Sequence, residues 1–274
     1  MDKLVQRCER AAREMRRDIL RMGLKAGSSG AHLGGALSAV ELLATMYLGV
    51  LHLPERDCPV AARDRFILSK GHCVMAQYAA MRQAGLLSDT DLDSFENADS
   101  WLCSHATMNV SRGIEFSTGS LGQGLSLGIG TALALRQDHA AKARVFVLLG
   151  DGECDEGQVW EAALCAAHYG LSNLVAVVDA NGMQLDGNTD DVMRLGDLEA
   201  KWRAFGWEVR DVDGHDIPAL LSVFRSDGKG PVAVIAHTVK GKGISFMEQA
   251  PAWHHGRLGK KQFEQAIAEL EDTK

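Results

Sequence analysis

The sequence predicts an α/β protein with a doubly wound parallel sheet, and two observations carry this prediction. The runs 145–149 and 174–178 are almost wholly apolar, without the alternation of a half-exposed strand, which is typical of strands buried on both faces. Segments with helical periodicity separate the expected strands along the chain. Because alternating strands and helices form parallel sheets through right-handed crossovers, we expect helices on both faces of the sheet.

The expected elements follow one another without a linker, an internal repeat or a low-complexity tract. In chain order they are a charged amphipathic helix at 3–26, a helix at 37–50, a strand at 63–68, a helix to about 84, a Gly-, Ala- and Leu-rich helix at 122–136, the strand 145–149, a helix at 158–170, the strand 174–178, a helix at 197–205, a strand at 207–212, a helix at 216–227, a strand at 231–236 and an amphipathic helix at 260–271. The small residues of 122–136 indicate a tightly packed helix. We expect residues 1–274 to form a single domain.

Composition and charge argue against nucleic-acid-binding and membrane functions. The chain has 274 residues, of which 46% are hydrophobic, and its net charge of −7 argues against nucleic acid or an anionic membrane as partner. No apolar run approaches the roughly 20 residues of a membrane span, and the charged N-terminal segment lacks a signal-peptide core. The six cysteines, at 8, 58, 73, 103, 154 and 165, have no Cys-x-x-Cys spacing, which favours free thiols in a reducing compartment. We expect a cytoplasmic protein.

The triplet Gly150-Asp151-Gly152 directly follows the apolar run 145–149. In open α/β sheets, ligands bind beyond the carboxyl ends of the strands, which is where this triplet falls. Glycines allow the backbone to turn sharply and to approach a bulky anion, and a carboxylate is an oxygen ligand for a hard cation. An Asp-Gly turn alone is common in proteins, so a functional site needs a second observation.

That second observation is the polar loop after the next strand, which contains Asp179, Asn181 and Met183. Mg²⁺ prefers six oxygens in octahedral geometry and readily shares phosphate oxygens. A carboxylate from the first loop, with an amide oxygen and a backbone carbonyl from the second, leaves room for phosphate oxygens and a water. The two loops therefore predict a site for Mg²⁺ and a phosphorylated ligand.

Gly150-Asp151-Gly152, the spacer 153–180 and Asn181 together resemble the thiamine-diphosphate fingerprint. The surroundings resemble transketolase in particular, in the segments Ser-Thr-Gly-Ser-Leu-Gly-Gln-Gly at 117–124, Asp-Arg-Phe-Ile-Leu-Ser-Lys-Gly-His at 64–72 and Gly-Ala-His-Leu-Gly-Gly at 30–35. The resemblance covers nearly the whole chain in the correct order. It implies the thiamine-diphosphate-binding fold, as the diphosphate-binding domain of a transketolase.

This resemblance also implies the ligands of the cofactor. Asp151, Asn181 and the carbonyl of Met183 would hold Mg²⁺, with Ca²⁺ or Mn²⁺ as other possible cations. Gly152 would place its amide on the diphosphate. The remaining residues that match cofactor-binding positions are His72, Gly119, Ser120, Leu121, Gly150, Glu156 and His255.

Histidines and glutamates supply the expected catalytic residues. His32, His72, His105 and His255 match histidines that line the substrate channel or touch the diphosphate, and His254 stands beside His255 as an alternative. His32 and His72 would relay protons or hold hydroxyl groups; a single histidine is more often structural.

Glu156 and Glu161 match acidic residues that link the two active sites of the transketolase dimer. The alternative is that these glutamates are solvated residues in the first turns of a helix, where negative charge is favourable.

The resemblance further implies a partner chain. In the family, the glutamate that activates the aminopyrimidine ring and the groups that bind the sugar phosphate belong to a pyrimidine-binding domain, for which this sequence offers no segment. We expect a C-terminal transketolase subunit to supply that domain, with sugar phosphates as substrates and an α₂β₂ heterotetramer as the assembly.

The implied reaction is reversible transfer of a two-carbon ketol unit from a ketose phosphate to an aldose acceptor. One alternative is another thiamine-diphosphate enzyme, resembling deoxyxylulose-phosphate synthase or a 2-oxoacid dehydrogenase. Another is a non-catalytic subunit that has kept the fold. The matches at 64–72 and 117–124 favour transketolase over the first, and the intact Asp151, Asn181, His32 and His72 disfavour the second.

Overall fold

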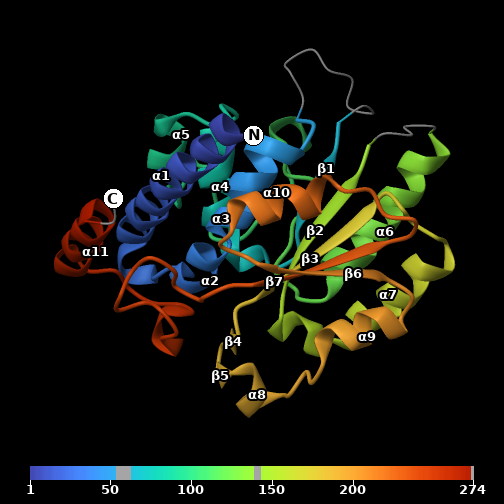
Figure 1. Cartoon of the computed structure of the whole chain (residues 1–274). Coiled ribbons are helices and arrows are strands. Elements are labelled where there is room, and N and C mark those ends of the chain that lie inside the picture. The colour runs from blue at the N-terminus through green and yellow to red at the C-terminus, as the bar shows by residue number, and fades with distance from the viewer. Residues whose placement is uncertain (54–62, 139–142, 273–274) are drawn as a thin grey trace.

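Five parallel strands form the centre of the computed structural model, which describes residues 1–53, 63–138 and 143–272 (Figure 1). Their order across the sheet is β1 (Arg65–Leu68), β2 (Val145–Gly150), β3 (Leu174–Ala180), β7 (Val232–His237) and β6 (Glu208–Asp213). Every neighbouring pair is parallel. The predicted α/β fold is confirmed, and the loops that follow the strands meet at one edge of the sheet.

Two layers of helices cover the faces of this sheet (Figure 1). One layer contains α1 (Asp2–Ala26), α2 (Leu33–Ser38), α3 (Val40–Thr45), α4 (Val74–Gln83) and α10 (Ile217–Arg225), and the other contains α6 (Gln123–Gln137), α7 (Gly157–His168) and α9 (Leu198–Ala204). The helix α11 (Lys260–Asp272) lies beside α1. Within the described ranges, no helix combines the length and the apolar character needed to cross a membrane.

Successive residues of a strand enter two different cores. Phe146 and Leu148 of β2 pack with the helices of the first layer, whereas Val145, Val147 and Leu149 pack with those of the second. Each such side chain contributes about 1.5–3 kcal/mol when it is fully buried. Because both faces of β2 are buried, its sequence lacks the alternation of a surface strand.

The helix predicted at 37–50 is not continuous in the structure. The segment forms α2, α3 and a π-helical turn at Met46–Val50, with the first break at Ala39 (φ −87°, ψ 4°). Since all residues of α2 and α3 are buried, apolar periodicity does not mark where one ends and the next begins.

Several short elements were not predicted. They are α5 (Asp89–Asp93), the hairpin of β4 (Met183–Gln184) and β5 (Gly187–Asn188), α8 (Thr189–Val192), and 3-10 turns at Gly27–Ser29, Gly71–Cys73, Val110–Arg112, Gly152–Asp155 and Pro251–Trp253. A capping box between Ser88 and Asp91 starts α5. The cysteines that the structure describes are free, and Cys58 lies outside the described residues.

Glycines let α6 pack closely against the sheet, as its small residues predicted. A Cβ atom on Gly124 would overlap Ser69 Oγ, and one on Gly128 would lie 2.6 Å from Val147 Cγ2. Gly130 of the same helix is exposed, and a Cβ atom there would have no neighbour within 4 Å. Gly128 and Gly130 therefore differ in their contact with the sheet.

This difference gives a matched pair of substitutions. We expect Gly128→Ala to lower the free energy of unfolding by about 1–3 kcal/mol, because the added methyl group must displace buried Val147. Gly130→Ala should raise it by about 0.5–1 kcal/mol, because alanine favours the helix. Chemical denaturation of the purified variants measures both values, and equal effects would contradict the close packing at Gly128.

Candidate active site

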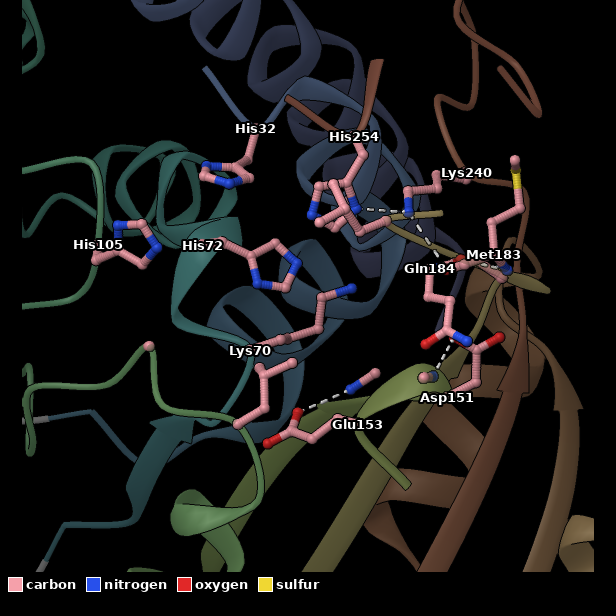
Figure 2. Close-up of a pocket in the computed structure, with 17 residues that line it drawn as sticks. His32, Lys70, His72, His105, Asp151, Glu153, Met183, Gln184, Lys240 and His254 are labelled. Carbon is pink, nitrogen blue, oxygen red and sulfur yellow. Dashed lines mark hydrogen bonds between the residues drawn. The ribbon is translucent and has the colours of Figure 1, made fainter. Parts of the chain in front are cut away.

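A cavity of about 290 Å³ opens at the carboxyl ends of β1, β2, β3 and β7 (Figure 2). Lys70 and His72 enter it after β1, residues 150–153 at the end of β2, and Lys240 after β7. The segment after β3 contributes Asn181, Met183, Gln184 and Leu185. The remaining lining residues are His32, Gly35, His105, Gly119, Leu121 and His254. The cavity thus lies at the edge of the sheet where the two polar loops predicted a site.

Asp151 is buried at the end of β2, where backbone amides hold its carboxylate. Oδ1 accepts a hydrogen bond from the amide of Gly152 at 2.9 Å, and Oδ2 accepts one from the amide of Gly182 at 2.6 Å. Burial and the nearby Asp179 carboxylate raise the pKa of Asp151 to about 6. Negative charge is therefore in excess at this point, and a bound cation would stabilise it.

The second predicted loop brings its oxygens to the same cavity. Asn181 Oδ1 accepts a hydrogen bond from the amide of Met183 at 3.1 Å. The carbonyl of Met183 in turn accepts one from Lys240 Nζ at 3.3 Å. An ammonium group thus lies against an oxygen that is expected to bind a metal.

Lys70 and Asp179 form a buried ion pair next to Asp151. Ser38 Oγ, at 2.6 Å, and Thr238 Oγ1 also donate hydrogen bonds to the Asp179 carboxylate. Burial alone would raise the pKa of Asp179, but Lys70 and the hydrogen bonds hold it below its usual value. The pair joins the ends of β1 and β3 to α2 and to the loop after β7.

Glu153 connects the β2 loop to the start of α6. Its carboxylate accepts hydrogen bonds from Ser69 Oγ and from the amides of Gly122, at 2.9 Å, and Gly150, at 3.1 Å. Burial raises the pKa of Glu153. This carboxylate fixes the glycine-rich segment at 117–124 beside the Asp151 loop.

Histidines gather on the side of the cavity away from Asp151 (Figure 2). The ring centroid of His32 lies 5.3 Å from those of His72 and His105 and 5.5 Å from that of His254. Gly119, with φ +150°, allows the approach of His105, because a Cβ atom there would lie 3.1 Å from His105 Cδ2. The predicted His32, His72 and His105 are therefore brought together.

Most of these rings are neutral. Burial, with the neighbouring His255 and His254, lowers the pKa of His32 to about 3. Burial and Lys240 lower the pKa of His254 to about 4, and burial and Lys70 hold the pKa of His72 well below its usual value. Each neutral ring offers one N–H donor and one unprotonated nitrogen, the combination that proton transfer needs.

Some of the predicted site residues do not line the cavity. Ser120, Glu156 and Glu161 are exposed, the two glutamates at the start of α7. His255 is also exposed and packs on His32, with 4.6 Å between ring centroids. Of the two adjacent histidines it is His254 that reaches the cavity.

Other lining residues were missed by the sequence analysis, among them Lys70, Glu153, Gln184 and Lys240. Lys240 follows β7, so the strand-end argument that selected Asp151 and Asn181 would also have found it. Lys70 lies inside the segment 64–72 that was already recognised. Nothing in the sequence distinguishes Glu153 from the acidic residues beside it.

The neutral histidines predict a pH dependence of stability. The pKa of His32 falls from 6.5 to about 3 on folding, so the unfolded chain binds the additional proton, and stability falls as pH drops from about 6.5 towards 3. A His32→Gln variant lacks this loss. The difference in free energy of unfolding, variant minus wild type, should therefore be larger at pH 4.5 than at pH 7.5. Chemical denaturation at both pH values checks this prediction. If the free energy of unfolding changed equally in the two proteins, His32 would be protonated in the folded chain at pH 4.5, contrary to the prediction.

In comparisons with known proteins, this chain is similar to transketolases and transketolase subunits. One subunit of the apulose-4-phosphate transketolase of Phocaeicola vulgatus is 40% identical over 244 residues, which are 88% of this chain and 86% of that protein. The 6-deoxy-6-sulfo-D-fructose transketolase subunit SqwG of Clostridium sp. (strain MSTE9) is 42% identical over 244 residues, 88% of either chain. The transketolase of Pichia stipitis in complex with sedoheptulose-7-phosphate superposes with a TM-score of 0.84 at 26% identity, over 98% of this chain and 41% of that one.

A family match extends over nearly the whole chain. Residues 8–271 match the family described as transketolase, thiamine diphosphate binding domain. The match includes every strand of the sheet and every residue that lines the cavity. The resemblance found in the motifs is confirmed, and the chain belongs to the transketolase family, as its thiamine-diphosphate-binding domain.

Proposed function

We propose that this chain is the diphosphate-binding subunit of a two-chain transketolase. With a C-terminal transketolase subunit, it transfers a two-carbon ketol unit from a ketose phosphate to an aldose acceptor. The observation that carries the proposal is the meeting of Asp151, Asn181 and Met183 with the histidine cluster in one cavity. Similar proteins that are named as transketolase subunits, and that match over 86–88% of their own length, support the two-chain arrangement.

The oxygens of Asp151, Asn181 and Met183 fit a divalent cation. A carboxylate, an amide oxygen and a backbone carbonyl are hard ligands, and the incomplete set leaves positions for phosphate oxygens and water. The raised pKa of Asp151, beside the Asp179 carboxylate, marks a place where positive charge is favourable. Mg²⁺ is the proposed ion, and Ca²⁺ or Mn²⁺ would use the same oxygens.

Lys240, the histidines and Gly152 suit a diphosphate next to that cation. Burial and Lys70 lower the pKa of Lys240 to about 8, so it is largely protonated at pH 7 and attracts phosphate oxygens. The amide of Gly152 donates to Asp151 Oδ1, and a phosphate oxygen would take over this hydrogen bond. A side chain at Gly152 would meet Gln184, whose Cβ lies 2.8 Å from the Cβ position.

The residues of this chain would hold substrate and move protons. When bound, thiamine diphosphate supplies the electron sink for cleavage of a carbon–carbon bond. The unprotonated ring nitrogens of His32 and His72 can accept a proton from a substrate hydroxyl group, and their N–H groups can hold an oxygen in place. His105 and His254 border the same space and would bind hydroxyl groups of the sugar.

A second chain would close the cavity. Leu185 lines the cavity and is 60% exposed, and Val192 and Met193 are exposed in the neighbouring segment, an apolar surface that a partner would bury. The partner would carry the pyrimidine-binding domain and its activating glutamate. Glu156, which precedes α7, and Glu161 in its first turns are both exposed, and they would contact another protomer of a proposed α₂β₂ assembly.

The two-chain arrangement predicts dependence on a partner. We expect the purified chain, with thiamine diphosphate, Mg²⁺, a ketose-phosphate donor and an aldose acceptor, to show no ketol transfer. Addition of the product of a neighbouring gene that encodes a pyrimidine-binding domain should restore it, because the cofactor is inert without its activating carboxylate. A coupled assay measures the turnover, and robust activity of the chain alone would refute the proposal.

The metal site predicts the effect of removing one charge. Asp151→Asn keeps the size but replaces one of the two oxygens that accept backbone hydrogen bonds. It should weaken Mg²⁺-dependent binding of thiamine diphosphate to the complex by about 100-fold or more, since changes to residues that only support the ligands of a metal already cost 10–100-fold. Asn181→Ala should have a smaller effect, because an amide binds Mg²⁺ less strongly than a carboxylate.

Calorimetric titration measures these affinities, and Asp227→Asn, an exposed carboxylate outside the cavity, is the matched control. Unchanged Mg²⁺-dependent binding in Asp151→Asn would show that the ion does not bind there.

A further inference from the structure

The segment 239–242, which follows β7 and carries Lys240 into the cavity, is held by groups from distant parts of the chain. The amide of Val239 donates a hydrogen bond to His215 Nε2 at 2.9 Å. The amide of Gly241 donates to the carbonyl of Gly34 at 2.9 Å. Arg16 Nε donates to the carbonyl of Lys242 at 3.0 Å. Since no helix or strand includes these residues, such contacts determine where Lys240 lies.

The residues that hold this segment form a buried network of their own. The Glu41 carboxylate accepts hydrogen bonds from Arg16 Nη1 at 2.7 Å and Nη2 at 3.0 Å, and it lies 2.9 Å from His215 Nδ1. Because Nε2 of His215 accepts the amide of Val239, the ring proton is on Nδ1 and points to Glu41. Burial raises the pKa of Glu41, but Arg16 and His215 outweigh it and hold the value at about 2.

We propose that Arg16, Glu41 and His215 are positioning residues that hold Lys240 in place for the diphosphate. The inference rests on the proposed function, which assigns the diphosphate to this cavity. Arg16 comes from α1, Glu41 from α3 and His215 from the turn between β6 and α10. Arg16 and His215 therefore contact the backbone on the two sides of one cavity residue, and Glu41 joins their side chains.

Close packing couples the position of Lys240 to the position of this network. A Cβ atom on Gly243 would lie 2.7 Å from Arg16 Nε, and one on Gly34 would lie 3.2 Å from Lys240 Cγ. The Lys240 side chain is buried, and its Nζ lies 2.9 Å from His254 Nδ1. A shift of the segment would therefore displace the ammonium from both the Met183 carbonyl and His254.

A positioning role differs from a general stabilising role in how its effect combines with the loss of Lys240. Buried ion pairs often add little net stability over apolar side chains of similar size, so a contribution to geometry is a reason to keep one. If His215 acts through Lys240, its replacement should matter only while Lys240 is present. Effects of two residues that act independently add in the double variant.

The experiment is a double-mutant cycle with His215→Phe and Lys240→Met in the full chain, with Mg²⁺ and inorganic pyrophosphate as the probe in calorimetric titration. We expect either single variant to weaken pyrophosphate binding roughly tenfold, the scale of one charge-assisted hydrogen bond, and the double variant to bind no more weakly than Lys240→Met alone. Hydrogen exchange of the free chain should be faster at the amides of Val239 and Gly241 in His215→Phe.

Glu115→Gln is the matched control. It breaks the buried Arg63–Glu115 ion pair, which lies at the opposite end of the strands from the cavity, and it should leave both the affinity and the exchange at 239–242 unchanged. Circular dichroism tests whether each variant folds, and Glu41→Gln replaces His215→Phe, with the same expectation, if the latter does not fold.

The outcomes separate this inference from the proposed function. Additive losses in the double variant, or unchanged exchange at Val239 and Gly241, would overturn the positioning role and leave the diphosphate site in place. No binding of Mg²⁺ and pyrophosphate by the wild-type chain would instead overturn the proposed site, and this inference with it.

Discussion

The buried ion pair between Lys70 and Asp179 is the interaction on which the cavity depends. Asp179 lies one residue before the end of β3, close to the Asp151 and Asn181 loops. Its carboxylate is bonded by groups from the segment after β1, from α2 and from the segment after β7. Leaving either charge without its partner in such a place typically costs about 3–5 kcal/mol. The pair therefore fixes the relative positions of four chain segments that would otherwise meet only as loops.

Charge is divided across the cavity in a way that suits a metal–diphosphate ligand. Asp151 concentrates negative charge at one side, Lys240 supplies a cation between the loops, and His32 and His72 remain neutral. A fully charged histidine cluster would bind anions more tightly but would have no unprotonated nitrogen to accept a proton. The family match and the names of the similar proteins favour transketolase over the other thiamine-diphosphate enzymes considered.

The sheet and the positions of Asp151 and Asn181 at its edge were predictable because each depends on a local pattern. Apolar runs marked the buried strands, and the strand-end rule placed Asp151 and Asn181 at one edge of the sheet. The break at Ala39 was not predictable, since buried residues flank it on both sides. The choice of His254 over His255 and the network of Arg16, Glu41 and His215 depend on contacts between segments far apart in sequence, which no local pattern encodes.

The order of strands has a consequence for how the protein is made. Val145 of β2 pairs with Arg65, and Val175 of β3 with Val232, so the sheet is completed only by contacts between residues far apart along the chain. Such topologies fold slowly, because long loops must close before their contacts are gained. The cavity draws on residues from His32 to His254, so it is absent from a nascent chain that has not yet exposed its last quarter. A ligand that binds in this cavity would therefore stabilise the finished fold by mass action, but it would not act as a template for the early stages of folding.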